Sequence, residues 1–437
     1  MISTMKSCKV RIVYGIKDKD LVSFMNRGAF SNKAESVARD VLADVKKNGD
    51  SAILYWARKF DGCVLPNYSL RVKHFEMLNA CRNVEKAFKR AVGESISRIT
   101  RFALASAKKS WSMSTPCGGK LGEQFVALDR VGVYVPGGAA PLASTALMTA
   151  VIAKVAGVKE IVACTPADRN GKVNPYLLYA LQSAGASEVY KVGGIQAIGL
   201  MAYGTKTIRK VQKIVGPGGT FVTAAKRQVY GEVALDLVAG PSEIAVLADG
   251  TADARHVAAD LLSQIEHGTG WEKALLITTS RKLAEDVRVE LVFQSGLLSR
   301  STAIRKTIKR GMLLAVVRNL KEGLDVCNSF APEHLEILTA NPRILLGKVR
   351  CAGAVFVGQW TPESAGDFVA GPSHVLPTGG AARMFSGLTT DDFRRRSSFI
   401  EFSRKDLEET LHVIEEFGRV EGLEAHVRSA QIRFEKK

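Results

Sequence analysis

The chain has 437 residues, and its 46% hydrophobic and 24% charged residues are typical of a folded globular protein, which excludes wholesale disorder. Its length predicts roughly two to four domains. The 61 basic residues outnumber the 43 acidic ones, and the net charge of +18 is spread along the chain without a nucleic-acid recognition motif. No apolar run approaches the ~20 residues of a membrane helix or resembles the core of a secretory signal, so we expect a cytoplasmic protein with neither a nucleic-acid nor a membrane partner.

The first third of the chain is predicted to be helical. Hydrophobic residues one turn apart precede Asn48-Gly49, where glycine can adopt the positive φ that ends a helix. Two further helices are expected near 51–60 and 88–103. We expect all three to cover a sheet and to carry no chemistry.

From Arg130 onward, short apolar strands alternate with helices, and glycines stand at the strand-to-helix turns. This alternation predicts a parallel sheet. The turns Pro136-Gly137-Gly138 and Gly216-Pro217-Gly218-Gly219 are compatible with a phosphate-bearing ligand, because helix N-termini offer free N–H groups. Tight turns need glycine in any case, so this signal is weak. The strands are expected at 131–135, 160–164, 188–192 and 211–215.

A second block of the same kind follows and ends in a loop rich in glycine, proline and serine at 361–387. After Thr389 the pattern predicts two helices, of which the first is capped by Ser403. The chain is therefore expected to have an α/β fold with parallel sheets. The strands of this block are expected at 243–248, 274–279, 313–317, 335–338 and 354–357.

Residues with potential chemistry are few. The chain contains no GxGxxG, GxxxxGK[ST] or HExxH motif, and its seven cysteines form no CxxC pair. Gln264 and His267 stand three residues apart at a helix end, so that an amide oxygen and an imidazole could bind one metal ion. Glu333 and His334 follow a proline turn, where adjacent carboxylate and imidazole groups could act as a general acid/base pair.

Four further candidates lie towards the C-terminus. Asp367 and His374 are in the long loop, and Glu421 and His426 are in the last helical segment. Each taken singly is more often structural than functional. Together, imidazole, carboxylate and amide groups suit zinc or a similar divalent ion, although spacing alone does not show that they converge.

The chain resembles the histidinol dehydrogenase family from about Lys33 to Arg433. The resemblance rests on several motifs in a fixed order. These motifs are at 129–138, 224–229, 239–243, 263–267, 331–335, 362–367 and 374–378.

The resemblance implies NAD-linked, zinc-dependent oxidation of L-histidinol through L-histidinal to L-histidine, the last steps of histidine biosynthesis. It implies that His334 takes the alcohol proton and that Glu333 activates water against the aldehyde. One zinc ion per subunit would be bound by four residues, namely Gln264, His267, Asp367 and His426. The substrate would contact these four and His334, together with Ser242, His374 and Glu421.

The resemblance also implies NAD contacts at Tyr134 and Gln196. Two positions depart from the family pattern, since Gly219 and Ser373 stand where asparagine is commoner. These departures leave room for a paralogue that oxidises another primary alcohol, such as a dihydroxypropanesulfonate. A non-catalytic binding protein is the alternative of another class.

For the fold, the resemblance implies two large domains like incomplete Rossmann folds, with small N-terminal and C-terminal helical domains. It also implies a homodimer whose active sites are shared, with Glu421 and His426 reaching into the partner's site. The expected division is a small segment at 1–30, a first large domain of 31–133 with 242–388, a second large domain at 134–241, and a dimerisation segment at 389–437.

Overall fold

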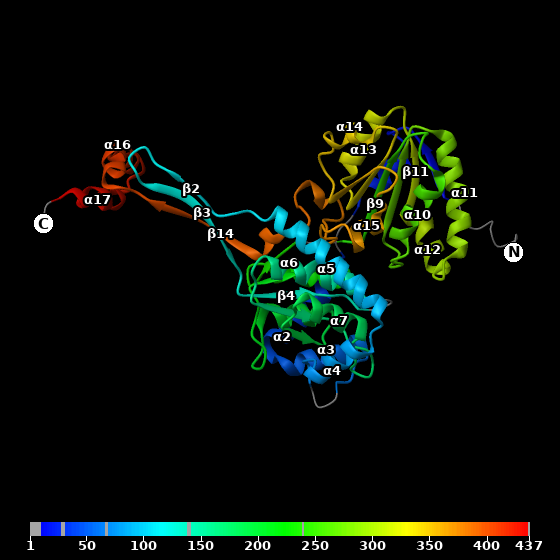
Figure 1. Ribbon diagram of the computed structural model, residues 1–437, viewed down its shortest axis with the longest axis horizontal. Helices are drawn as coiled ribbons and strands as arrows, with labels where there is room; N and C mark the ends of the chain where they lie inside the picture. The colour runs from blue at the N-terminus through cyan, green and yellow to red at the C-terminus, as the bar shows by residue number, and fades with distance from the viewer. Residues whose placement is uncertain (1–9, 28–30, 66–68, 138–140, 238–239, 436–437) are drawn as a thin grey trace.

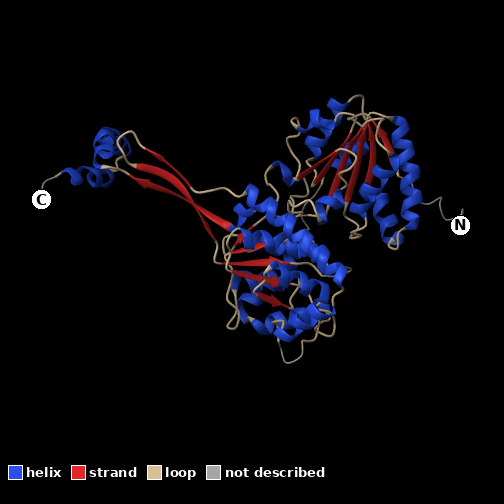
Figure 2. Cartoon of the chain, viewed as in Figure 1, coloured by secondary structure: helices blue, strands red, loops and turns tan. Residues whose placement is uncertain are grey.

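The computed structural model of the chain describes residues 10–27, 31–65, 69–137, 141–237 and 240–435 (Figure 1). Gly138 and Ala239, which belong to two of the motifs above, lie outside these ranges. No helix within them is long and apolar enough to cross a membrane. The architecture is α/β with two parallel sheets, as predicted, and a projecting arm that the sequence did not indicate (Figure 2).

The first parallel sheet has the strand order β6-β5-β4-β7-β8. Its central strand β4 is buried along its whole length, as expected for a parallel strand covered on both faces. The alternation predicted from Arg130 is confirmed. The strands are β4 (Arg130–Tyr134), β5 (Glu160–Cys164), β6 (Glu188–Tyr190), β7 (Lys213–Val215) and β8 (Ala234–Leu235), and the helices are α6 (Ala143–Val155), α7 (Pro175–Ala184), α8 (Gly194–Tyr203) and α9 (Thr220–Gln228).

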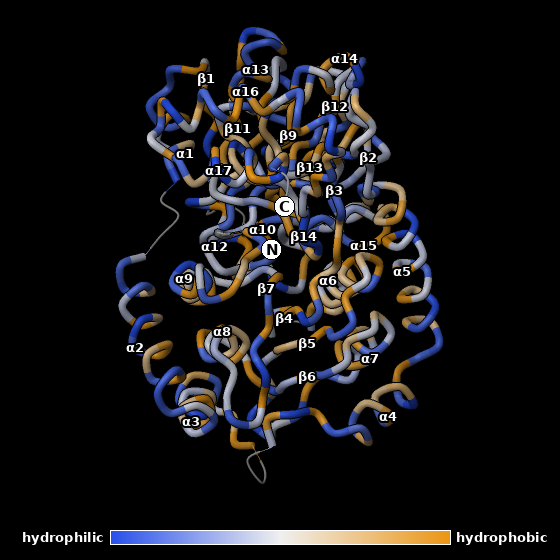
Figure 3. Tube along the Cα trace, turned by 90° about the vertical axis from the view of Figure 1, so that its left-hand side faces the viewer, coloured by the Kyte–Doolittle hydropathy of each residue, from blue (hydrophilic) through white to orange (hydrophobic). Residues whose placement is uncertain are grey.

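The N-terminal helices cover this same sheet. The apolar face of α2 (Asn32–Asn48) packs on α8 and α9, whereas α5 (Lys86–Ser106) packs on α6 (Figure 3). The expected division grouped residues 31–133 with 242–388, but the helices in that segment belong to the core around β4. The amphipathic pattern of a helix shows that one face is buried without showing which sheet buries it. The other two N-terminal helices that cover the first sheet are α3 (Asp50–Asp61) and α4 (His74–Asn83).

The second parallel sheet has the order β1-β11-β10-β9-β12-β13. Its edge strand β1 (Arg11–Tyr14) comes from the N-terminal segment, which therefore joins the second sheet instead of standing apart. The other strands are β9 (Glu243–Ala248), β10 (Lys273–Thr278), β11 (Met312–Val316), β12 (His334–Leu338) and β13 (Ala354–Val357). The helices are α1 (Lys19–Met25), α10 (Ala254–Ile265), α11 (Arg281–Leu297), α12 (Ser301–Gly311), α13 (Leu320–Phe330), α14 (Pro342–Leu346) and α15 (Glu363–Phe368).

The arm is a three-stranded antiparallel sheet that projects from the body and carries two helices at its tip (Figure 1). Its strands are β14 (Arg394–Glu401), β3 (Lys120–Ala127) and β2 (Trp111–Ser114). Ser403 caps α16 (Arg404–Glu421) as predicted, and α17 (Glu424–Gln431) follows. The strands were not predicted, because β14 begins with three arginines and pairs with a segment more than 250 residues earlier.

The last strand of the first sheet is followed in the chain by the central strand β9 of the second sheet. The chain leaves the carboxyl end of β8 and enters the amino end of β9 only a few residues later. The carboxyl edge of the first sheet and the amino edge of the second are therefore connected by one short segment, and the candidate residues gather at these two edges.

Candidate active and metal site

The predicted acid/base pair stands at the amino end of β12. Glu333 and His334 are 6% and 3% exposed, and they follow Ala331, whose φ of 47° is the positive value that turns the chain out of α13. A left-handed alanine costs about 1 kcal/mol, a strain that clusters at functional sites. The only sign of this conformation in the sequence is the proline that follows Ala331.

Both side chains are held by the backbone of one residue, Glu243, at the start of β9. Its N–H donates to Glu333 Oε2 at 2.9 Å, and its carbonyl accepts from His334 Nδ1 at 3.1 Å. Because a carbonyl only accepts, the proton of a neutral His334 is on Nδ1 and its Nε2 is free to act as a base. Nε2 is buried and has no hydrogen-bond partner among the described residues.

The electrostatics of the pair follow from burial. Burial lowers the pKa of His334 to about 4, so its imidazole is neutral at pH 7. Burial raises the pKa of Glu333 well above its ordinary value, and the nearby carboxylates Glu243, Glu363 and Asp367 raise it further. The site therefore holds a neutral base beside a carboxyl group that resists ionisation.

A group of ligand atoms surrounds His334. His334, Glu363 and Asp367 each offer one such atom, and these atoms lie within 4.8 Å of one another. Glu363 and Asp367 both come from α15, and Glu363 also accepts a hydrogen bond from Ser263 on α10. Sequence reasoning missed Glu363, whose only signal is its place in the motif that contains Asp367.

Gln264, in the last turn of α10, is fully buried. Neither its amide oxygen nor its amide nitrogen has a hydrogen-bond partner in the described part of the chain. An unpaired buried amide costs free energy, so this side chain fits an external ligand such as a metal ion. A donor set of amide oxygen, imidazole and carboxylate suits zinc.

His267 lies in the turn after α10 and influences the pKa values of both His334 and Asp367, which places it near them. Burial is the largest influence on Asp367 and raises its pKa. The close contact with His374 and the charges of the neighbouring histidines outweigh burial, so the pKa of Asp367 is lowered. This carboxylate is therefore ionised and available to a cation.

His374 links the two halves of the molecule. Its Nδ1 lies 3.6 Å from Asp367 Oδ1, and its Nε2 lies 3.1 Å from the hydroxyl of Thr145 on α6. The neighbouring Ser373 stands where asparagine is commoner in the family. Its hydroxyl donates to the carbonyl of Met148 at 2.9 Å and so anchors the loop on α6. Ser242, half-buried, directly precedes Glu243.

Two predicted residues are not brought to this site within one chain. Glu421 ends α16 and His426 lies in α17, both exposed at the tip of the arm, whereas α15 lies in the body around the second sheet (Figure 1). Apolar side chains are exposed beside them on α16 and in the turn before α17. These include Phe417, Val420 and Leu423.

The predicted cofactor residues lie at the carboxyl edge of the first sheet. The Tyr134 hydroxyl accepts from the N–H of Gly194 at 3.1 Å, and burial raises the pKa of Tyr134 to about 12. The buried Gln196 donates to Asp61 Oδ2 at 3.2 Å, while its Oε1 has no partner among the described residues. Gly219 caps α9, and an added Cβ there would meet no described atom within 4 Å.

A cavity of about 700 Å³ opens beside these residues. Asp61, Gly137, Thr165 and Pro166 line it, and the buried Thr165 hydroxyl lacks a partner in the described ranges. Sequence reasoning missed Asp61, which closes α3 far from the sheet in the chain. The polar groups and the volume suit a nucleotide-sized ligand.

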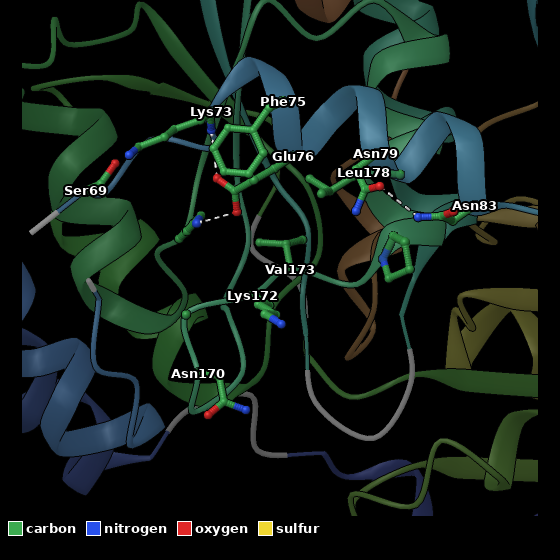
Figure 4. A pocket seen from close by; sticks show the side chains of 14 residues that line it. Ser69, Lys73, Phe75, Glu76, Asn79, Asn83, Asn170, Lys172, Val173 and Leu178 are labelled. Carbon is green, nitrogen blue, oxygen red and sulfur yellow. Dashed lines mark hydrogen bonds and ion pairs between the residues drawn. The ribbon is translucent and has the colours of Figure 1, made fainter. Parts of the chain in front are cut away.

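Another cavity, of about 520 Å³, lies between α4 and the loop before α7 (Figure 4). Glu76 on its wall is neutralised by Lys191 at 2.6 Å, and Asn79 and Asn83 bond to each other. None of the predicted site residues lines it. The Glu76 carboxylate is thus paired within the protein, and this cavity lies apart from the predicted site.

A family model described as histidinol dehydrogenase matches residues 25–434. The histidinol dehydrogenase of Geobacillus kaustophilus is 44% identical over 397 residues, covering 91% of this chain and 93% of that protein, and that of Bacillus cereus is 42% identical over 412 residues, covering 94% and 95%. The crystal structure of histidinol dehydrogenase from Elizabethkingia anophelis matches with a TM-score of 0.92 at 34% identity, covering 97% of this chain and 98% of the other.

Proposed function

This chain belongs to the histidinol dehydrogenase family, oxidoreductases that act on an alcohol and an aldehyde, and we propose that it oxidises L-histidinol to L-histidine with NAD and zinc. The observation that carries the proposal is the buried constellation of His334, Glu333 and Gln264. It combines a neutral imidazole with a free Nε2, an adjacent carboxyl group, and an amide without a partner among the described residues.

In this proposal zinc is bound by Gln264, His267, Asp367 and His426 of the partner subunit. When bound, zinc would supply a Lewis acid that holds the imidazole and amino nitrogens of the substrate. The partnerless amide of Gln264 and the lowered pKa of Asp367 support this assignment. Ser242, His374 and Glu421 of the partner subunit would complete the substrate contacts.

The residues of this chain then move protons. His334 Nε2 accepts the hydroxyl proton while a hydride passes from the carbinol carbon to NAD, which gives the aldehyde. Glu333 accepts a proton from the water that adds to the aldehyde, and a second hydride passes from the hydrate to a second NAD. The products are the carboxylate, two NADH and three protons, which His334 and Glu333 pass on to solvent. Glu333 must ionise before it can accept a proton, and burial and nearby carboxylates oppose its ionisation. We therefore expect the second oxidation to be more sensitive than the first to the surroundings of Glu333.

The cavity at the first sheet is the proposed NAD site. Tyr134, Gln196 and the Gly219 turn border the strand ends, and Asp61 is available to ribose hydroxyls. Because Gly219 has no side chain, one contact to the proposed cofactor is missing. The space around Gly219 is open, so nothing there blocks the cofactor.

We further propose a cytoplasmic homodimer in which each arm reaches the other subunit. The exposed Glu421 and His426 lie at the tip of the arm beside exposed apolar residues, which suits a surface that is covered on assembly. A monomer would lack one metal ligand.

The test is the NADH yield per molecule of L-histidinol, with and without a zinc chelator. Two NADH per substrate, lost on chelation and restored by zinc, are expected. Bound zinc with no turnover of histidinol but oxidation of another primary alcohol would contradict the substrate assignment. Ser373 gives that alternative no support, because its hydroxyl is engaged with α6.

A further inference from the structure

The first residue of β9, Glu243, holds both members of the acid/base pair through its backbone N–H and carbonyl groups. The N–H of Glu243 orients Glu333, and its carbonyl orients His334. Glu243 is the first residue of its strand. It is opposite Lys273 in the register with β10, whereas the register with β12 begins one residue later, at Ile244 opposite His334. On the β12 side, the peptide groups of Glu243 therefore bond to the side chains of Glu333 and His334 and not to a strand backbone.

The side chain of Glu243 is anchored elsewhere. It is buried and forms an ion pair with Arg27, and the side chains of the two residues are 3% and 7% exposed. The N–H of Gly379 also donates to this carboxylate. Arg27 comes from the segment after α1, which is distant from the site in sequence.

Arg27 also contacts the segment that leads into β12. Its guanidinium donates to the carbonyl of Phe330 and lies 3.8 Å from the centre of the Phe330 ring. Phe330 is the last residue of α13, three residues before Glu333. One guanidinium therefore joins the start of β9, whose first residue bonds to the catalytic pair, to the end of α13, which leads into that pair.

We propose that Arg27 and Glu243 are positioning residues for Glu333 and His334. Their ion pair holds the Glu243 peptide so that His334 keeps its Nδ1 proton and presents Nε2, and so that Glu333 stays beside it. A displacement of about 1 Å at a reacting group costs up to about a hundredfold in rate. The inference rests on the proposed function, because the pair is catalytic only if the chain oxidises an alcohol.

The experiment uses the dimeric, zinc-loaded enzyme and the single variant Arg27→Met. We expect kcat to fall at least about tenfold for both L-histidinol and L-histidinal, with KM values and zinc content within about twofold of the wild type. The matched control is Arg130→Met, which removes a buried arginine that pairs with Glu160 and Glu188 at the amino end of β4. This control is expected to lower Tm and to leave kcat unchanged.

The double variant Arg27→Met/Glu243→Gln separates positioning from simple stability. Removing both charges relieves the unpaired buried carboxylate, so Tm is expected to rise above that of Arg27→Met while kcat stays low. Recovery of kcat together with Tm would overturn the inference, as would a folded Arg27→Met enzyme with the kcat of the wild type.

If Arg27→Met does not fold, Arg27→Lys keeps the charge but cannot reach Glu243 and Phe330 with one planar group. It is expected to retain zinc and lose kcat, and an unchanged kcat would refute the inference. The proposed function fails separately, because its failure would appear in the wild-type enzyme as absent histidinol turnover.

Discussion

Replacing Gln264 by leucine should make the metal-free protein more stable while removing zinc. The side chain is fully buried, and both of its polar atoms lack a partner among the described residues. Each such group costs about 1–3 kcal/mol, so the lower end gives about 2 kcal/mol for the amide. Leucine has a similar volume and no polar atom, and it should recover this free energy.

The effect is measurable as a shift in thermal unfolding. For a domain of about 150–250 residues, 1 kcal/mol moves Tm by about 2–4 °C, so we expect about 4–8 °C in the presence of a chelator. With zinc in excess the order should reverse, because only the wild type gains free energy from binding the ion. Urea unfolding at 25 °C and metal analysis of the purified protein complete the assay.

A control tests whether the gain is specific to an unpaired amide. Gln228 on α9 is half-buried, and its Nε2 donates to the backbone and side chain of Glu35. Gln228→Leu should therefore destabilise the chain. If metal-free Gln264→Leu is less stable than the wild type, or retains zinc, the assignment of this amide to a metal site is refuted.

Three further predictions concern the proton chemistry and the assembly. Glu333→Gln should slow aldehyde oxidation more than alcohol oxidation in single-turnover measurements of NADH, and the reverse order would contradict its role. Burial raises the pKa of Glu336 well above that of the unfolded chain, so ionisation costs stability as pH rises above about 4.5. Glu336→Gln, which mimics the neutral acid, should gain stability at pH 8 but not at pH 4.5, and an equal effect at both would refute the linkage. Mixing inactive His334→Ala and His426→Ala subunits after unfolding should restore about a quarter of the wild-type activity if each site uses one residue from each chain, and no recovery would exclude shared sites.

The sequence was informative wherever a structure depends on local periodicity. The alternation after Arg130 and the end of α2 at Gly49 were readable because strands, helices and their turns have distinct residue patterns. The arm was not readable, since β14 pairs with β3 across most of the chain and its exposed strands show no apolar alternation. Periodicity also left open which sheet each N-terminal helix covers.

The candidate site shows the same limit. Glu333 and His334 were recognisable as neighbours in a motif, but Glu243 acts through its peptide groups and Arg27 acts through Glu243. Neither function leaves a signature in residue type. Asp61 joins the cofactor cavity only because α3 packs on α8, a contact between segments far apart in the chain.

The opposed edges of the two sheets have an electrostatic consequence. At the amino edge of the second sheet, α10 and α13 end beside Gln264 and Glu333, and the C-termini of helices carry partial negative charge. At the carboxyl edge of the first sheet, α8 and α9 begin at Gly194 and Thr220, and helix N-termini carry partial positive charge. The backbone alone thus polarises the region: the end with the proposed metal ligands would favour a divalent cation, and the end with the helix N-termini would favour the pyrophosphate of the proposed dinucleotide. Two charged ligands of opposite sign would thereby be drawn to opposite ends of the region by the backbone alone.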